Sequence, residues 1–313
     1  MALISRSWIM VPAFGREQEK DMKLWERVEY SAIVDRKPLR LPDNRTVAVW
    51  PLVTVEVWDP DEPLPRTILP PPQGKSFIPD VPNWTWAEYG MRIGFWRMKE
   101  ALDRRGLKAV FCINGSVIDR YPRVCQAALE AGWEFMGHNI IQKPMHSMPN
   151  EKEAIQQTIA AIQKFTGTKP RGWMGPGLTE THQTPELLVA AGLEYTVDWV
   201  LDDQPVVIKT KEGPLYSVPY SVEVNDVVLM ANDKRPSSEL LERALESCDR
   251  YLLEGPNQAR ILALACHPYL HGVPHRIGYF ERTLDDLAAK PGVMFTTGGE
   301  ILDWYKTQRP LSA

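Results

Sequence analysis

The stretch TVAVWPLVTVEVW, residues 46–58, decides the fold. It is a long β-branched and aromatic run in which polar and apolar positions do not alternate, which is typical of a strand covered on both faces. Parallel sheets lying between helices bury their strands in this way. We therefore expect this stretch to be the first strand of an α/β sheet, with Glu56 near its end.

Helical and apolar segments alternate along the rest of the chain. Helices are expected over residues 85–106, 121–132, 151–166, 184–192, 237–253 and 276–289, and from Gly299 onward. The apolar runs between them are LKAVFCING, WEFMGHN, RGWMGPG, LEYTVDWV, PLYSVPYS, NDVVLMA, RILALACHP and VMFTT. This alternation predicts a mainly parallel sheet, and no GxGxxG motif follows the first strand. We predict a distorted (β/α) barrel with about seven parallel strands.

The predicted barrel domain covers residues 46–313 and follows an irregular, charged N-terminal arm over residues 1–45, with a possible short helix over residues 17–29. Directly after the first strand, residues 59–84 read DPDEPLPRTILPPPQGKSFIPDVPNW. So many prolines exclude both a helix and a central strand. A loop of this length that leaves a central strand is expected to carry function.

The composition narrows the class of partner. The formal net charge is -4, and no basic stripe is present, which argues against nucleic acid and acidic membranes as partners. No apolar run reaches the length of a membrane span, and no export leader is recognisable, so we expect a soluble, cytoplasmic protein that acts on a small molecule. Four widely spaced cysteines are expected to be buried thiols: Cys112, Cys125, Cys248 and Cys266.

Three polar residues end apolar runs and are the candidate catalytic groups. Glu56 ends the first run, His138 ends WEFMGHN and His267 ends RILALACHP. In a (β/α) barrel the carboxyl ends of the strands form the working face, so a carboxylate and two imidazoles would meet there. They could supply a general base, a group that stabilises an oxyanion or binds a metal, and a general acid. The alternatives are structural: Glu56 paired with Arg92 or Arg171, and histidines that cap backbone carbonyls.

The other histidines are assigned to loops. HPYLHGVPHR places His271 and His275 at helical spacing from His267, but its prolines and glycine break a continuous helix, so we do not expect one zinc-binding face. His146 lies in a proline-flanked loop near the expected mouth of the site, and His182 is expected at the surface.

The expected substrate-binding residues lie in turns and near the proline-rich loop. In RGWMGPG, the tight turn at Gly175 and Pro176 would let backbone N–H groups approach a ligand or an oxyanion. Aromatic side chains beside the proline-rich loop could wall a pocket. The full predicted set is Trp84, Trp86, Tyr89, Arg92, Trp173, Gly175, Pro176 and Trp199.

The order of these motifs resembles the polysaccharide deacetylase (NodB-homology) superfamily, over roughly residues 47–304. The segments EYGMRIGFWRM, RGWMGPG, DDQP and HPYLHGVPHR look most like the branch that contains metal-independent allantoinases and cyclic-imide hydrolases. The resemblance implies a NodB-like barrel and hydrolysis of a carbon–nitrogen bond in an amide. It also implies a homo-oligomer, because the arm and the aromatic loop resemble parts that pack between subunits.

Carried over by position, Glu56 matches the family's catalytic base and His267 its general acid. His138 matches the first histidine of the H-x-x-x-H metal motif. Two expected ligands are replaced, by Val57 and Gln142, and neither side chain is a good zinc ligand. We therefore expect no metal. A substitute divalent site, for zinc for example, would draw on Glu56, His138, His146 and His267.

The leading prediction is a hydrolase of non-peptide carbon–nitrogen bonds that opens a small cyclic amide, ureide or imide without a cofactor. Glu56 would activate water, His267 would protonate the departing nitrogen, and His138 with backbone N–H groups near Gly175 would hold the carbonyl oxygen. Two alternatives stay open: a metal-dependent N-deacetylase of an acetylated sugar or oligosaccharide, and a non-catalytic binding protein that kept the barrel.

Overall fold

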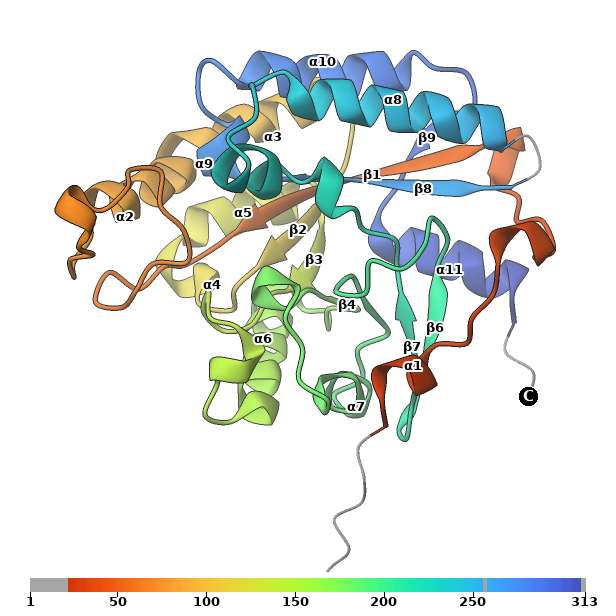
Figure 1. Ribbon diagram of the computed structural model, residues 1–313, viewed down its shortest axis with the longest axis horizontal. Coiled ribbons are helices and arrows are strands. Elements are labelled where there is room, and N and C mark those ends of the chain that lie inside the picture. The colour runs from red at the N-terminus through yellow and green to blue at the C-terminus, as the bar shows by residue number, and fades with distance from the viewer. Residues whose placement is uncertain (1–21, 256–257, 311–313) are drawn as a thin grey trace, which may run out of the picture.

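The sheet of this protein is mainly parallel and lies between helices (Figure 1). The computed structural model describes residues 22–255 and 258–310. In spatial order its strands are β6 (Val206–Thr210), β7 (Gly213–Ser217), β5 (Tyr195–Thr196), β4 (Gly172–Trp173), β3 (Glu134–Gly137), β2 (Val110–Ile113), β1 (Val47–Val55) and β8 (Arg260–Cys266), and β9 (Val293–Phe295) pairs with β1. Each adjacent pair is parallel except β6 and β7.

The curved sheet is not closed by strand pairing in the described part of the chain, because β6 and β8 are the two ends of the strand order. Irregular segments span the gap. The backbone N–H of Ile261 donates to the carbonyl of Asp203 at 3.0 Å, and Asn225 forms a parallel bridge with Ala265. The predicted distorted, NodB-like (β/α) barrel is confirmed, with its distortion at this seam.

Alternation along each strand sorts the side chains between two hydrophobic layers. In β1, Val47, Val49 and Val53 pack toward the outer helices, whereas Ala48, Trp50 and Leu52 pack into the barrel interior. Successive side chains of a strand point to opposite faces, so Glu56 follows the interior series. By the same count, His138 continues the series of Met136 in β3. His267 continues the series of Ile261, Ala263 and Ala265 in β8.

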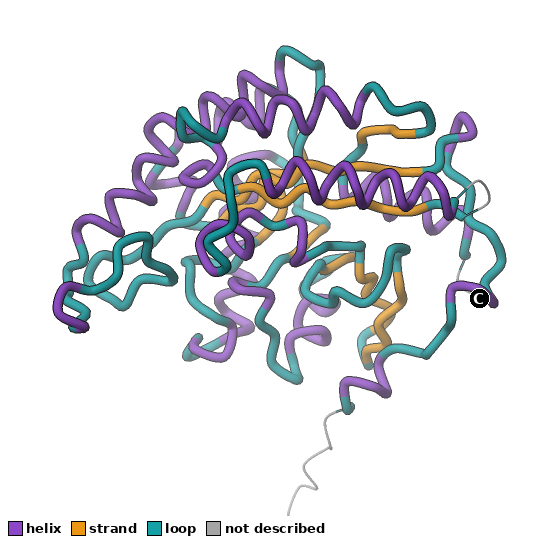
Figure 2. The backbone as a smooth tube through the Cα atoms, turned by 45° about the horizontal axis from the view of Figure 1, so that its top comes forward, coloured by secondary structure: helices purple, strands orange, loops and turns teal. Residues whose placement is uncertain are grey.

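Helices cover the outer faces of the strands (Figure 2). They are α1 (Leu24–Arg27), α2 (Val81–Tyr89), α3 (Phe95–Asp103), α4 (Val117–Arg120), α5 (Pro122–Glu130), α6 (Glu151–Thr166), α7 (Thr184–Ala190), α8 (Glu239–Glu254), α9 (Pro268–His271), α10 (Ile277–Ala288) and α11 (Gly298–Gln308). Figure 1 shows α8 and α10 along one side of β1 and β8, and α6 and α7 on the other side of the molecule. No helix among the described residues is long and apolar enough to cross a membrane.

The structure corrects three expectations about secondary structure. The run NDVVLMA is not a strand: Val227–Asn232 form a π-helix, which begins where the Asn225 side chain accepts the N–H of Val227. Val206–Thr210, which the sequence pattern did not single out, form β6. The helix expected over residues 17–29 begins outside the described residues, and its described part is the short α1.

The long helix after the proline-rich loop contains a π-helical insertion, Gly90–Gly94, between α2 and α3. The insertion brings two glycines against α9, the turn that follows His267. A Cβ atom on Gly94 would lie 2.1 Å from the carbonyl oxygen of Pro268, and one on Gly90 would lie 2.7 Å from the backbone N of Tyr269. Glycine is needed at both places because backbone meets backbone there, and this contact fixes where the α9 turn sits.

Replacing Gly94 with alanine is therefore expected to destabilise the protein by about 1–3 kcal/mol, because the added methyl group has no space beside Pro268. Gly278→Ala in α10 is the matched control, since a Cβ atom there meets nothing within 4 Å. Urea unfolding of both variants measures the difference. Equal stability of the two variants would contradict the close-packing argument.

Candidate active site

The structure brings the three predicted catalytic residues together at the carboxyl ends of β1, β3 and β8. The Oε1 atom of Glu56 lies 3.5 Å from Nε2 of His267 and 3.9 Å from Nε2 of His138. The three residues are at most 5% exposed. A carboxylate and two imidazoles thus face one another in a space that is largely closed to bulk solvent.

The cationic partner of Glu56 is Arg66, which comes from the proline-rich loop. Its Nη1 atom lies 2.9 Å and 3.2 Å from the two carboxylate oxygens. The pairing of Glu56 with Arg92 or Arg171 is wrong: Arg92 is exposed, and Arg171 binds Glu194 and Asp303 instead. The indole N–H of Trp58 also donates to Glu56, at 2.7 Å.

The environment of Glu56 keeps its carboxylate ionised. Burial alone would raise its pKa, but the charge of Arg66 and the nearby His267 outweigh burial and hold the pKa well below its usual range. The same pairing raises the pKa of Arg66. Glu56 is therefore an anion throughout the neutral range.

His138 is oriented by a backbone carbonyl. Its Nδ1 lies 2.6 Å from the oxygen of Met174, which can only accept, so Nδ1 carries the proton. In the neutral ring Nε2 is then an acceptor, and it has no hydrogen-bond partner among the described residues. Two acceptors, His138 Nε2 and Glu56 Oε1, thus face each other 3.9 Å apart, a spacing at which one water molecule could donate to both.

A buried aspartate that the sequence did not point to supports His267. Asp226, at the start of the π-helix, lies 2.6 Å from Nδ1 of His267 and also accepts its backbone N–H at 2.7 Å. Its second oxygen lies 2.8 Å from Nδ1 of His271. The assignment of His271 to a loop is wrong: Pro268 begins the α9 turn, which buries His271 against Asp226.

The ionisation states of Asp226 and its two histidine partners, His267 and His271, depend on one another. Burial opposes ionisation of Asp226, yet His267 and His271 lower its pKa to about 2. Burial likewise disfavours a charged His267, but Asp226 and Glu56 more than offset this and raise its pKa. His267 is therefore held as a proton donor whose Nε2 points toward Glu56.

The residues at the family's metal position do not suit a cation. Val57 offers no ligand atom, and the Gln142 carbonyl oxygen accepts from Asn114 at 3.3 Å. The guanidinium of Arg66 already places a positive charge against Glu56. Of the substitute set, Glu56, His138 and His267 lie together, whereas His146 is exposed and lines a different cavity, with His182 and Trp199.

One group of possible ligands among the described residues has its ligand atoms within 4.8 Å of one another, namely Asp226, Cys266 and His271. Both oxygens of Asp226 already accept hydrogen bonds from the two imidazoles. Burial raises the pKa of Cys266 well above its usual value, so its sulfur is a neutral thiol. The group is better suited to supporting His267 than to holding an ion.

Two N–H groups of the RGWMGPG turn that could have held an oxyanion are bound within the protein. The N–H of Gly175 donates to both carboxylate oxygens of Asp198, at 2.9 Å each, and the N–H of Met174 donates to Gly137. Trp199 is also directed elsewhere, since its indole N–H binds Glu180 at 2.7 Å. These donors are already occupied.

The predicted aromatic residues divide into two groups. Trp173 lies on the outer face of β4, buried among side chains of α6 and α7, because it has the opposite strand parity from Met174. Trp86 does lie near the site: its ring is 4.9 Å from that of Tyr269, which in turn lies 5.4 Å from Trp58. Trp84, Tyr89 and Arg92 line a separate small cavity.

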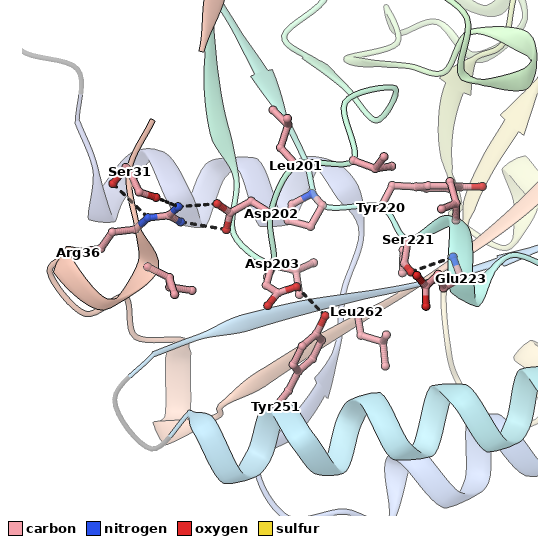
Figure 3. Close-up of a pocket in the computed structure, with 16 residues that line it drawn as sticks. Ser31, Arg36, Leu201, Asp202, Asp203, Tyr220, Ser221, Glu223, Tyr251 and Leu262 are labelled. Atoms are coloured by element: carbon pink, nitrogen blue, oxygen red, sulfur yellow. Dashed lines mark hydrogen bonds and ion pairs between the residues drawn. The ribbon is translucent and has the colours of Figure 1, made fainter. Parts of the chain in front are cut away.

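A cavity of about 390 Å³ is lined by Arg66, the ionic partner of Glu56. Arg66, Gln142 and Pro176 line it, together with Lys143 and Glu62, which form an ion pair at 3.1 Å. A second cavity, of about 530 Å³, lies at the barrel seam (Figure 3). Four of its polar side chains are already paired, Arg36 with Asp202 and Tyr251 with Asp203.

Comparison with known proteins shows similarity to one family. Residues 88–196 match the polysaccharide deacetylase family. A putative polysaccharide deacetylase of Schizosaccharomyces pombe is 27% identical over 249 residues, which cover 72% of this chain and 77% of the relative. The predicted resemblance to the polysaccharide deacetylase superfamily is confirmed.

Solved structures resemble the fold of this chain along most of its length. A probable polysaccharide deacetylase of Pseudomonas aeruginosa PAO1 has a TM-score of 0.77 at 22% identity, covering 87% of this chain and 95% of that one. The PuuE allantoinase also has a TM-score of 0.77, at 20% identity, covering 94% and 100%. At these identities the likeness shows the fold, so the reaction has to be argued from the site.

The contact between Asp226 and His267 predicts that the pKa of His267 depends on the charge of Asp226. Because Asp226 raises the pKa of His267, the imidazolium is kept to a higher pH than in an isolated histidine. In Asp226→Asn the negative charge is lost while burial stays, so the pKa of His267 should fall below its value in the parent protein. Histidine ring signals followed by NMR against pH measure this, and an unchanged pKa would contradict the assignment.

Proposed function

We propose that this protein hydrolyses the carbon–nitrogen bond of a small cyclic amide, ureide or imide without a metal ion. The observation that carries the proposal is the contact of one ionised carboxylate, Glu56, with two imidazoles on one side and with the Arg66 guanidinium on the other. The positive charge that a deacetylase metal would supply is replaced here by a side chain. The family resemblance supports hydrolysis of an amide.

In the first step, a water molecule held between Glu56 Oε1 and His138 Nε2 attacks the carbonyl carbon. Glu56 takes one proton from the water, the new C–O bond forms, and the carbonyl π pair moves to its oxygen. His138 serves as an acceptor that orients the water, which is the role its Nδ1 bond to Met174 leaves open. This replaces the sequence-based hypothesis that His138 holds the carbonyl oxygen.

In the second step, the tetrahedral intermediate collapses. The C–N bond breaks as His267 gives its Nε2 proton to the departing nitrogen, and the ring opens to a carboxylic acid and an amine or ureido group. The proton on Glu56 can then return to His267 across the 3.5 Å that separates Oε1 from Nε2. Atoms and charge balance, because one water is consumed and both side chains recover their starting states.

The size of the cavity lined by Arg66 favours a small ring over an oligosaccharide. Its volume of about 390 Å³ lies near the lower end of ordinary ligand pockets. A strained cyclic amide or imide is also easier to open than an unactivated acetamide when no metal polarises the carbonyl. A metal-dependent N-deacetylase is the second candidate, favoured by the family match itself. A cytoplasmic location and a homo-oligomeric state stay predictions from the sequence.

Replacing Glu56 with glutamine is expected to lower kcat by about 10²–10⁴-fold, since the amide cannot accept the proton of the attacking water. Turnover is measured by NMR on a panel of cyclic amides, ureides, imides and N-acetylated sugars. Glu100→Gln, on the exposed surface of α3, is the matched control and should keep full activity. Near-normal turnover by Glu56→Gln would exclude the mechanism.

Metal removal separates the two candidate activities. Dialysis against a chelator should leave the ring-opening rate unchanged, because Val57 and Gln142 leave no adequate ligand set around Glu56. Elemental analysis of the dialysed protein is the accompanying measurement. Loss of activity on chelation, with recovery on addition of zinc, would favour the metal-dependent deacetylase.

A further inference from the structure

The proposed mechanism requires a donor for the oxygen that becomes negatively charged, and four groups near the site cannot serve. The N–H groups of Gly175 and Met174 are bound within the protein. With the Nδ1 proton bound to the Met174 carbonyl, the Nε2 atom of His138 faces Glu56 as an acceptor when the ring is neutral. His267 must keep its proton for the departing nitrogen.

Arg66 has donors left over. Its Nη1 atom makes all of the hydrogen bonds that this side chain forms with the described residues, two to Glu56 and one to the Tyr269 hydroxyl. Nη2 and Nε have no partner among the described residues, and Arg66 lines the cavity of about 390 Å³. A planar guanidinium can bind a carboxylate through one nitrogen and a ligand oxygen through another.

Aromatic rings hold the guanidinium in place. Its central carbon lies 5.4 Å from the centre of the Trp58 ring and 5.8 Å from that of Tyr269. Trp86 packs edge-on against Tyr269 and completes this aromatic support. The Arg66 side chain is only 14% exposed, so its charge acts where solvent screening is weak. A cation fixed before the substrate arrives costs little reorganisation during the reaction.

We propose that Arg66 is a catalytic residue that binds the carbonyl oxygen of the scissile amide through Nη2 or Nε and stabilises the oxyanion of the tetrahedral intermediate. This inference rests on the proposed function of the site. Arg66 thereby does with a guanidinium what a metal ion would do with a Lewis-acid bond. The proline-rich loop, which the barrel does not need for closure, delivers this group to Glu56.

The kinetic test compares Arg66→Gln with Arg66→Lys, each at its own pH optimum. The glutamine variant should lose about 10²–10³-fold in kcat with a much smaller change in KM, as for removal of an oxyanion donor, and lysine should recover part of the loss. Millimolar guanidinium should rescue Arg66→Gln, which a purely structural role of Arg66 would not allow. Lys75→Gln removes a cation from the same loop and is the control, expected to be unchanged.

A binding test addresses Arg66 independently of turnover. If the protein turns over no cyclic amide, the proposed function is excluded, but the binding test still decides whether Arg66 binds an oxyanion. In Glu56→Gln the guanidinium has no anionic partner, so this variant should bind methylphosphonate, a tetrahedral oxyanion, in calorimetry. Glu56→Gln with Arg66→Gln should not bind it. Equal binding by the two variants, or no binding by either, would overturn the assignment of Arg66. Full activity of Arg66→Gln, with no effect of added guanidinium, would overturn it as well.

Discussion

The ion pair between Glu56 and Arg66 is the interaction on which the site depends. Burying a carboxylate at the carboxyl end of a strand costs free energy unless a nearby charge and hydrogen bonds compensate for the lost hydration. Here the compensation comes from Arg66, Trp58 and His267. Removing only one partner would leave a buried charge unpaired, so the proline-rich loop and the barrel are coupled through this contact.

Two features of the backbone orient the catalytic side chains. Strand parity aims Glu56, His138 and His267 into the barrel, and glycines in the π-helical insertion let α9 approach closely enough to fix the backbone just after His267. A second π-helix begins at Asp226, whose carboxylate holds His267. The irregular helical segments, and not the regular ones, thus set the orientation of the proton donor.

Much of the fold and part of the site could be predicted from the sequence, because they depend on local patterns. Apolar runs marked the strands, and the polar residue after each run marked Glu56, His138 and His267. Arg66 and Asp226 could not be found in this way, since each reaches the site through a long-range contact from a segment without periodicity. The available signal for Arg66 was its place in a long loop leaving the strand of Glu56.

The central claim is that a guanidinium, not a metal ion, polarises the substrate at Glu56. The most direct measurement is a crystal structure of the Glu56→Gln protein with an unreacted cyclic imide, collected with anomalous data for transition metals. The account predicts the scissile carbonyl oxygen within hydrogen-bond distance of Arg66 Nη2 or Nε, with no metal peak beside His138. A cation bound to the carbonyl oxygen, with Arg66 displaced, would contradict it.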